Sequence, residues 1–133
     1  MSFTLIHDEA RTNMQNLIKF IHRYWLTISL MVLCAITVLS LTPAPSLPTV
    51  PGTDKSHHFI AYAALMFSVA LRKPQHWLFI GLFFLGWSGA IELIQPYVNR
   101  YGEWLDLAAN AGGLLCGILL STLINHFLPV RHP

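Results

Sequence analysis

The chain has 133 residues, of which 54% are hydrophobic and only 11% are charged, and its formal net charge is +2. A soluble domain carries about a quarter charged residues, so this composition excludes an ordinary soluble globular protein and indicates that lipid covers the apolar surface. The length fits a single domain. So small a net charge gives no reason to expect a nucleic-acid partner, and we predict none.

The first 23 residues form a mixed tail that carries a helical pattern. Two interpretations of this helix remain open, namely an interfacial helix on the cytoplasmic leaflet and an extension of the span that follows. We divide the chain into a cytoplasmic tail (residues 1–23), a membrane domain (24–128) and a second cytoplasmic tail (129–133). The apolar stripe of the first tail has spacings of three and four, and consists of Ile6, Ala10, Met14, Leu17 and Ile21.

Four apolar segments follow one another along the membrane domain, and each approaches the roughly 20 residues that a helix needs to cross a bilayer. The second is the shortest and reaches that length only when counted from Asp54. The first is followed by a proline cluster and is too long for the core of a signal peptide, so we expect a retained helix. The predicted fold class is an all-α polytopic membrane protein with a four-helix transmembrane bundle, spanning at residues 24–42, 54–71, 76–98 and 105–128.

The distribution of Lys and Arg predicts the orientation. Four spans put the N-terminal tail, the turn between the second and third spans, and the C-terminal tail on one side of the membrane. We therefore predict a multi-pass protein of the bacterial inner membrane with both termini in the cytoplasm. The predicted cytoplasmic side holds six of the eight basic residues, namely Arg11, Lys19, Arg23, Arg72, Lys73 and Arg131, while Lys55 and Arg100 lie on the other side.

Polar side chains within the spans gather at the predicted outer face. Tyr62 continues the helical face of Asp54 and His58 inward, and Gly113 and Gly117 continue the face of Asp106 and Asn110 as small residues suited to close helix packing. A carboxylate at the depth of Glu92 is costly without a partner or a proton, and Arg100, Lys55 and His58 are the available cations. The predicted pocket consists of Asp54, Lys55, His58, Tyr62, Glu92, Gln95, Arg100, Asp106 and Asn110.

These residues also carry a family resemblance. The sequence resembles the VanZ-like membrane proteins through a DKxxHxxxY element, an ExxQ element followed by an arginine, and a DxxxNxxGxxxG element, in that order over about half the chain. The family takes its name from a protein associated with glycopeptide-antibiotic resistance, so the resemblance implies a cell-envelope setting but supplies no reaction. The matching residues are Asp54, Lys55, His58 and Tyr62, then Glu92, Gln95 and Arg100, then Asp106, Asn110, Gly113 and Gly117.

Structural alternatives exist for each part of this pocket. Glu92, Gln95 and Arg100 also suit a polar lock between helices, and Asp106 suits helix N-capping. His57 and His58 together raise the question of zinc, but adjacent helical positions point about 100° apart, so they do not serve one ion. His58 with Glu92 or Asp106 is the remaining combination, and we predict neither a metal nor another cofactor.

Two functions of different classes fit this sequence. The first is a non-catalytic envelope protein that binds an anionic or phosphorylated lipid in the outer-face pocket. The second is an intramembrane hydrolase or transferase acting on a lipid-linked envelope precursor, with Glu92 or Asp106 as base, His58 as acid and Arg100 stabilising charge. We expect the first, because no recognised catalytic arrangement is complete and the catalytic residues are unknown. Membrane lipids are the expected partners, and a homo-oligomer is compatible with the sequence.

Overall fold

The computed structural model describes residues 2–46 and 53–130, and all regular structure within these ranges is helical. The predicted all-α fold class is therefore confirmed for the described residues. The elements in chain order are α1 (Ser2–Leu41), the short 3-10 helix η1 (Ala44–Ser46), α2 (Asp54–Arg72), α3 (Trp77–Ile94), the 3-10 helix η2 (Gln95–Val98) and α4 (Trp104–Phe127).

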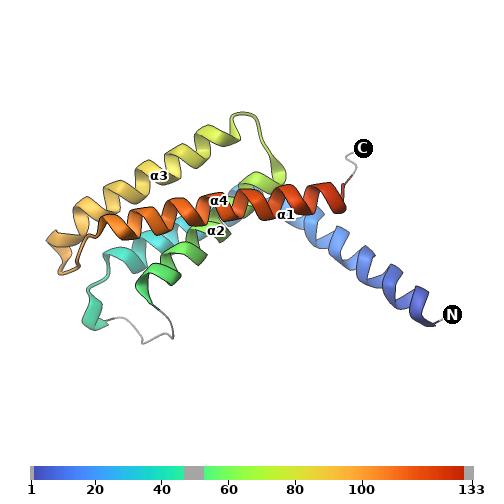
Figure 1. The fold of residues 1–133 in the computed structure, drawn as a ribbon, viewed down its shortest axis with the longest axis horizontal. Coiled ribbons are helices and arrows are strands. Elements are labelled where there is room, and N and C mark those ends of the chain that lie inside the picture. Colours follow the sequence, from blue (N-terminus) through green and yellow to red (C-terminus); the bar gives the residue numbers. More distant parts are fainter. Residues whose placement is uncertain (1, 47–52, 131–133) are drawn as a thin grey trace.

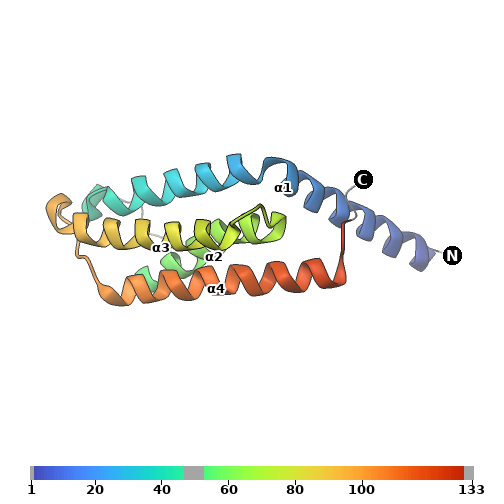
Figure 2. The same ribbon diagram turned by 90° about the horizontal axis from the view of Figure 1, so that it is seen from above.

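The four long helices lie alongside one another and alternate in direction. Figure 1 shows the N- and C-termini and the α2–α3 turn at one end, which we call the basic end. The opposite end, which we call the cluster end, holds the last turns of α1 and α3 and the first turns of α2 and α4 (Figure 2). Polar groups from three helices are thereby brought to one end of the bundle.

Helix α2 lies at the centre of the packing and contributes most of the buried apolar side chains. It packs most extensively on α4 and next on α1. Tyr62, Leu65 and Met66 on α2 are at most 1% exposed. The backbones of α2 and α4 approach most closely at Gly113 and Gly117, because a Cβ at Gly117 would lie 2.6 Å from the carbonyl oxygen of Ala63 and one at Gly113 would overlap the carbonyl of Phe59. Glycine at these positions permits the contact.

The N-terminal tail is helical, as its apolar stripe predicts, and it is continuous with the first apolar segment. The backbone leaves helical geometry at Tyr24 (φ −110°, ψ 18°), where the apolar segment begins. Beyond this kink the N-terminal part of α1 diverges from the other helices (Figure 2). An interfacial helix and an extension of the first span both require the tail to be helical. The bend at Tyr24 points this part of α1 in a different direction from the rest of the helix.

Three helical segments among the described residues are long and apolar enough to cross a membrane: Phe3–Leu41, Trp77–Val98 and Trp104–Phe127. Their outward faces carry large exposed apolar side chains such as Met31, Phe79 and Leu119, which is typical of lipid-facing surfaces. The sequence predicted a fourth span at α2. That helix has 19 residues, but its first turns are polar and lower its mean hydropathy. By length and composition α2 is therefore not among the candidate spans, and a four-span bundle is part of the proposal below.

Candidate functional site

A network of polar side chains fills the cluster end between α2, α3 and α4. Lys55 and His58 come from α2, Ser88 and Glu92 from α3, and the remaining members from α4 and the turn before it. We call this set the polar cluster; its residues are Lys55, His58, Ser88, Glu92, Glu103, Asp106 and Asn110. All are joined by hydrogen bonds or by ion-pair contacts within 4 Å.

Asn110 joins all three helices and is only 1% exposed. Its amide Nδ2 donates to Ser88 Oγ at 2.6 Å, and its Oδ1 lies 3.1 Å from His58 Nδ1. Because the amide nitrogen is used by Ser88, Oδ1 acts as acceptor and Nδ1 of the imidazole carries the proton that it donates. The other ring nitrogen, Nε2, then faces Asp106 Oδ2 at 3.8 Å. Asn110 therefore fixes both the orientation and the tautomer of His58.

Two carboxylates of the polar cluster are buried, since Glu92 and Asp106 are each 5% exposed. Glu92 Oε2 accepts a hydrogen bond of 2.9 Å from the backbone N–H of Glu103. Within the described residues, Glu92 Oε1 and Asp106 Oδ1 have no hydrogen-bond donor. Lys55 Nζ lies 3.7 Å from that Asp106 oxygen, which is an electrostatic contact only. Buried carboxyl oxygens without hydrogen-bond donors are energetically costly, and this site holds two of them.

Lys55 lies at the rim of the polar cluster, at the exposed start of α2. Its ammonium donates to Glu103 Oε2 at 2.8 Å, and both side chains are about half exposed, at 46% and 50%. This hydrogen bond raises the pKa of Lys55 above its ordinary value of 10.5; desolvation opposes the rise, and the nearby carboxylates of Glu103, Asp106 and Asp54 add to it. Lys55 is therefore charged at neutral pH.

Several residues of the predicted pocket lie outside the polar cluster. Gln95 is 1% exposed but faces α1, where its Nε2 donates to the carbonyl of Ser40 at 3.2 Å. Asp54 is exposed in the first turn of α2. Tyr62 is buried in the core beneath the cluster and lies beside Ser88.

The expected pairing of Glu92 with Arg100 is not found among the ion pairs of the described residues. Glu92 takes its hydrogen bond from Glu103 instead. Arg100 follows Asn99, which adopts a left-handed conformation (φ 56°), and its backbone N–H bonds to the carbonyl of Gln95. This tight turn ends η2 and brings the chain to Glu103, so Arg100 stands in the loop beside the cluster without entering it.

Helix N-capping, the structural alternative proposed for Asp106, is not observed at the start of α4. The N-cap position of α4 is Glu103, which makes no side-chain capping hydrogen bond, and Asp106 lies within the first turn. Its two oxygens face Lys55 and His58. Asp106 is therefore a member of the polar cluster and does not act as a capping residue.

The sequence-based analysis missed Ser88, Glu103 and Gly102. Ser88 lies four residues before Glu92 on α3, so helical spacing placed it on the same face and was a usable signal. Glu103 lies in a turn, where no periodicity applies. Gly102 is needed because a Cβ there would overlap the carbonyl oxygen of Glu92. This close approach lets the backbone N–H of Glu103 reach the Glu92 carboxylate.

Three members of the polar cluster have the residue types and spacing of metal ligands. His58, Glu92 and Asp106 each offer one donor atom, and these atoms lie within 4.8 Å of one another. His57 is not part of this group, in agreement with the argument that adjacent helical histidines diverge.

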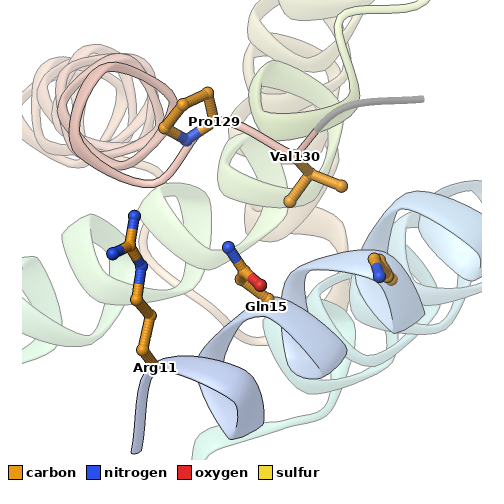
Figure 3. A pocket seen from close by; sticks show the side chains of 5 residues that line it. Arg11, Gln15, Pro129 and Val130 are labelled. Carbon is orange, nitrogen blue, oxygen red and sulfur yellow. The ribbon is translucent and has the colours of Figure 1, made fainter. Parts of the chain in front are cut away.

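The basic end differs in kind from the polar cluster. A cavity of about 370 Å³ is lined by Arg11, Gln15, Lys19, Pro129 and Val130, and Figure 3 shows Arg11 and Gln15 on α1 opposite Pro129 and Val130 beyond α4. A second cavity of about 220 Å³ shares Lys19 and is lined also by His22, Arg23 and Arg72. Among the described residues no carboxylate lines either cavity, so the charge of the described lining is positive.

A comparison of this chain with protein-family models, with curated proteins and with solved structures gives no match. The resemblance to VanZ-like proteins therefore rests only on the sequence motifs described above. A function must be inferred from the geometry of the polar cluster.

Proposed function

We propose that this chain is a four-span, VanZ-like protein of the bacterial inner membrane that binds the phosphorylated head group of an envelope lipid at the outer face. The observation that carries the proposal is the convergence of charged and amide side chains from three helices at one end of an otherwise apolar bundle. Ionisable residues inside membrane segments are expensive and usually mark functional sites.

The cations at the rim are the groups suited to an anionic head group. Lys55 is 46% exposed and forms an ion pair with Glu103. Arg100 lies in the α3–α4 turn that also contains Glu103. Glu92 and Asp106 are buried, and Asp106 lies 3.7 Å from Lys55, so these carboxyl groups are not exposed for direct contact with the phosphate. Because a guanidinium binds phosphate through two parallel N–H groups, Arg100 should contribute more to binding than Lys55.

The membrane orientation is part of the proposal. The basic end holds Arg72 and Lys73, as well as the cations of the N-terminal part of α1, and such an excess of basic residues marks the cytoplasmic side. We expect reporter fusions at Arg72 to show a cytoplasmic location and fusions at Tyr101 to show an outer location. A cytoplasmic signal at Tyr101 contradicts both the orientation and an outer-leaflet ligand.

Lipid analysis of the purified protein tests the binding function. We expect phosphorylated lipids that co-purify with the wild-type protein to be depleted in Arg100→Lys, which keeps the charge but loses the paired N–H groups. The matched control is Arg72→Lys at the basic end, which should retain the wild-type lipid content. Unchanged lipids in both Arg100→Lys and Lys55→Gln refute a head-group site at this face.

An enzyme is the second candidate, and one observation favours it. His58 Nε2 lies 3.8 Å from Asp106 Oδ2, while Asn110 orients the ring from its other side. An imidazole held between an amide and a carboxylate is suited to move a proton during hydrolysis or group transfer. Here His58 acts as acid, Glu92 or Asp106 acts as base, and Arg100 stabilises the developing charge.

Turnover separates the two candidates. The protein, reconstituted in lipid, is incubated with labelled lipid-linked envelope precursors, and products are separated by chromatography. An enzyme gives a product that accumulates with time and disappears in His58→Gln, whereas a binding protein retains the label on the intact precursor. Head-group depletion in Arg100→Lys without any product supports the binding function.

A further inference from the structure

We propose that His58, Glu92 and Asp106 together bind one divalent transition-metal ion. Each comes from a different helix, and their donor atoms lie within 4.8 Å of one another at the buried centre of the polar cluster. The sequence-based argument against a metal concerned His57 with His58, and it does not apply to this set. The site is distinct from the head-group proposal, because an ion can bind whether or not a lipid does.

The unsatisfied oxygens provide a second and independent observation. Glu92 and Asp106 are each 95% buried, and Glu92 Oε1 and Asp106 Oδ1 lack hydrogen-bond donors among the described residues. Two ionised carboxylates buried at this depth would repel each other and gain little from Lys55, whose Nζ lies 3.7 Å from Asp106 Oδ1. A divalent cation between them offsets both charges and gives the unsatisfied oxygens a partner.

The surroundings of the three side chains are those of a supported metal site. Asn110 accepts from Nδ1 of His58, so in the neutral imidazole the lone pair is on Nε2 and is directed toward Asp106, as a ligating imidazole requires. The backbone N–H of Glu103 holds the other oxygen of Glu92, which leaves Oε1 for the ion. Ser88 fixes the amide of Asn110 in turn. Metal ligands are usually oriented by second partners of this kind.

The donor set indicates the class of ion. One imidazole nitrogen with two carboxylate oxygens suits Zn²⁺ or Mn²⁺, whereas Ca²⁺ and Mg²⁺ favour sites built from oxygen alone. Donors on one Zn²⁺ lie about 3.4 Å apart, so the 3.8 Å between His58 Nε2 and Asp106 Oδ2, and separations of up to 4.8 Å within the set, must shorten as the ion binds. Three protein ligands leave a coordination position for water or for a phosphate oxygen.

Metal content and affinity test the inference on the full-length protein in detergent or lipid. The purification tag must not contain histidine. We expect about one Zn²⁺ or Mn²⁺ per chain by elemental analysis, and saturable calorimetric titration of the chelator-treated protein with ZnCl₂ or MnCl₂. Chelator should lower the thermal midpoint of the wild type, and the same ion should restore it. Asn110→Ala should weaken the affinity about 10- to 100-fold, because it removes the group that orients His58.

Near-isosteric variants distinguish a metal site from a structural cluster. Glu92→Gln and Asp106→Asn remove an ionic ligand with little change in shape, so they should fold, lose the bound ion and become insensitive to chelator. The matched control is His57→Ala, which lies beside the site but outside the ligand set and should retain the ion. The absence of saturable Zn²⁺ and Mn²⁺ binding overturns the proposal, as does wild-type binding by Glu92→Gln, a preference for Ca²⁺, or equal loss in His57→Ala and His58→Ala.

Discussion

The two ends of the bundle both carry charge, but they hold it in opposite ways. At the basic end the cations of Lys19, Arg23 and Arg72 line open cavities between helices. At the cluster end Glu92 and Asp106 are buried, and their contacts are to His58, Lys55 and a backbone N–H. Charges in contact with water cost little, whereas buried charges must be compensated by specific partners.

This difference indicates that the ends serve different purposes. Solvated cations at one end are sufficient to orient a membrane protein, because the orientation depends on their number and position rather than on their exact contacts. The polar cluster depends on contacts: Asn110, Ser88 and Glu103 each hold one ligand or one orienting group at a defined distance. Such an arrangement is the kind expected of a binding site.

The largest effect should follow from disturbing the α2–α4 contact beneath the polar cluster. In Gly113→Ala the new methyl group overlaps the backbone of α2 at Phe59, which cannot rotate away, so the helices must separate. We expect a loss of about 3 kcal/mol or more in unfolding free energy, measured by thermal or denaturant unfolding in detergent.

A glycine elsewhere in the bundle provides the control for this substitution. At Gly86 on α3 nothing lies within 4 Å of an added Cβ. Gly86→Ala should therefore leave stability unchanged or slightly increase it, since alanine has the better helix propensity. Equal losses in the two variants contradict the close approach of α2 and α4.

A smaller effect should distinguish the two asparagines of α4, which bridge to neighbouring helices at opposite ends. Asn110 contacts both His58 and Ser88 and is 1% exposed, whereas the partly buried Asn125 donates one hydrogen bond to the carbonyl of Leu71. We expect Asn110→Ala to cost about 2–3 kcal/mol, because it leaves buried partners unsatisfied, and Asn125→Ala about 1 kcal/mol.

A double-mutant cycle sharpens this comparison. Asn110 and Ser88 share a hydrogen bond of 2.6 Å. The double variant Asn110→Ala/Ser88→Ala should therefore lose less unfolding free energy than the sum of the losses in the two single variants. Strict additivity, or equal costs at Asn110 and Asn125, contradicts the view that the cluster end is the more strongly coupled of the two.

The helices and the membership of the site were predictable from the sequence to different extents. Hydrophobic periodicity and helix length predicted the all-α fold, and helical spacing placed His58, Asp106 and Asn110 on faces that meet. These regularities hold because a helix fixes the direction of each side chain. Within residues 2–46 and 53–130, three segments satisfy the length and composition of a span, and α2 does not, because the polar residues that enter the site lower its hydropathy.

The sequence did not predict how the α3–α4 turn is arranged. The pairing of Glu92 with Arg100 was expected from proximity along the chain, but a turn has no period from which contacts follow. The left-handed residue Asn99 and the close approach of Gly102 to α3 direct Glu103, and not Arg100, to the Glu92 carboxylate. Gln95 lies three residues after Glu92, about 60° away around the helix axis, and its side chain reaches α1, where Nε2 donates to the carbonyl of Ser40.

The smallest expected effect concerns the rim, where the polar cluster meets water as the basic end does. Lys55 and Glu103 form an ion pair of 2.8 Å with both side chains about half exposed, so Lys55→Gln should change stability only slightly. The pair raises the pKa of Lys55 above 10.5. A raised lysine pKa adds stability below the unfolded-state value, and that contribution is lost as the pH rises through the folded-state value. The thermal midpoints of wild type and Lys55→Gln should therefore differ slightly at pH 8 and converge as the pH rises through the folded-state pKa of Lys55. High salt should reduce the same difference. A difference that persists at high pH and high salt means that Lys55 acts through buried contacts, and the rim then belongs with the interior of the polar cluster.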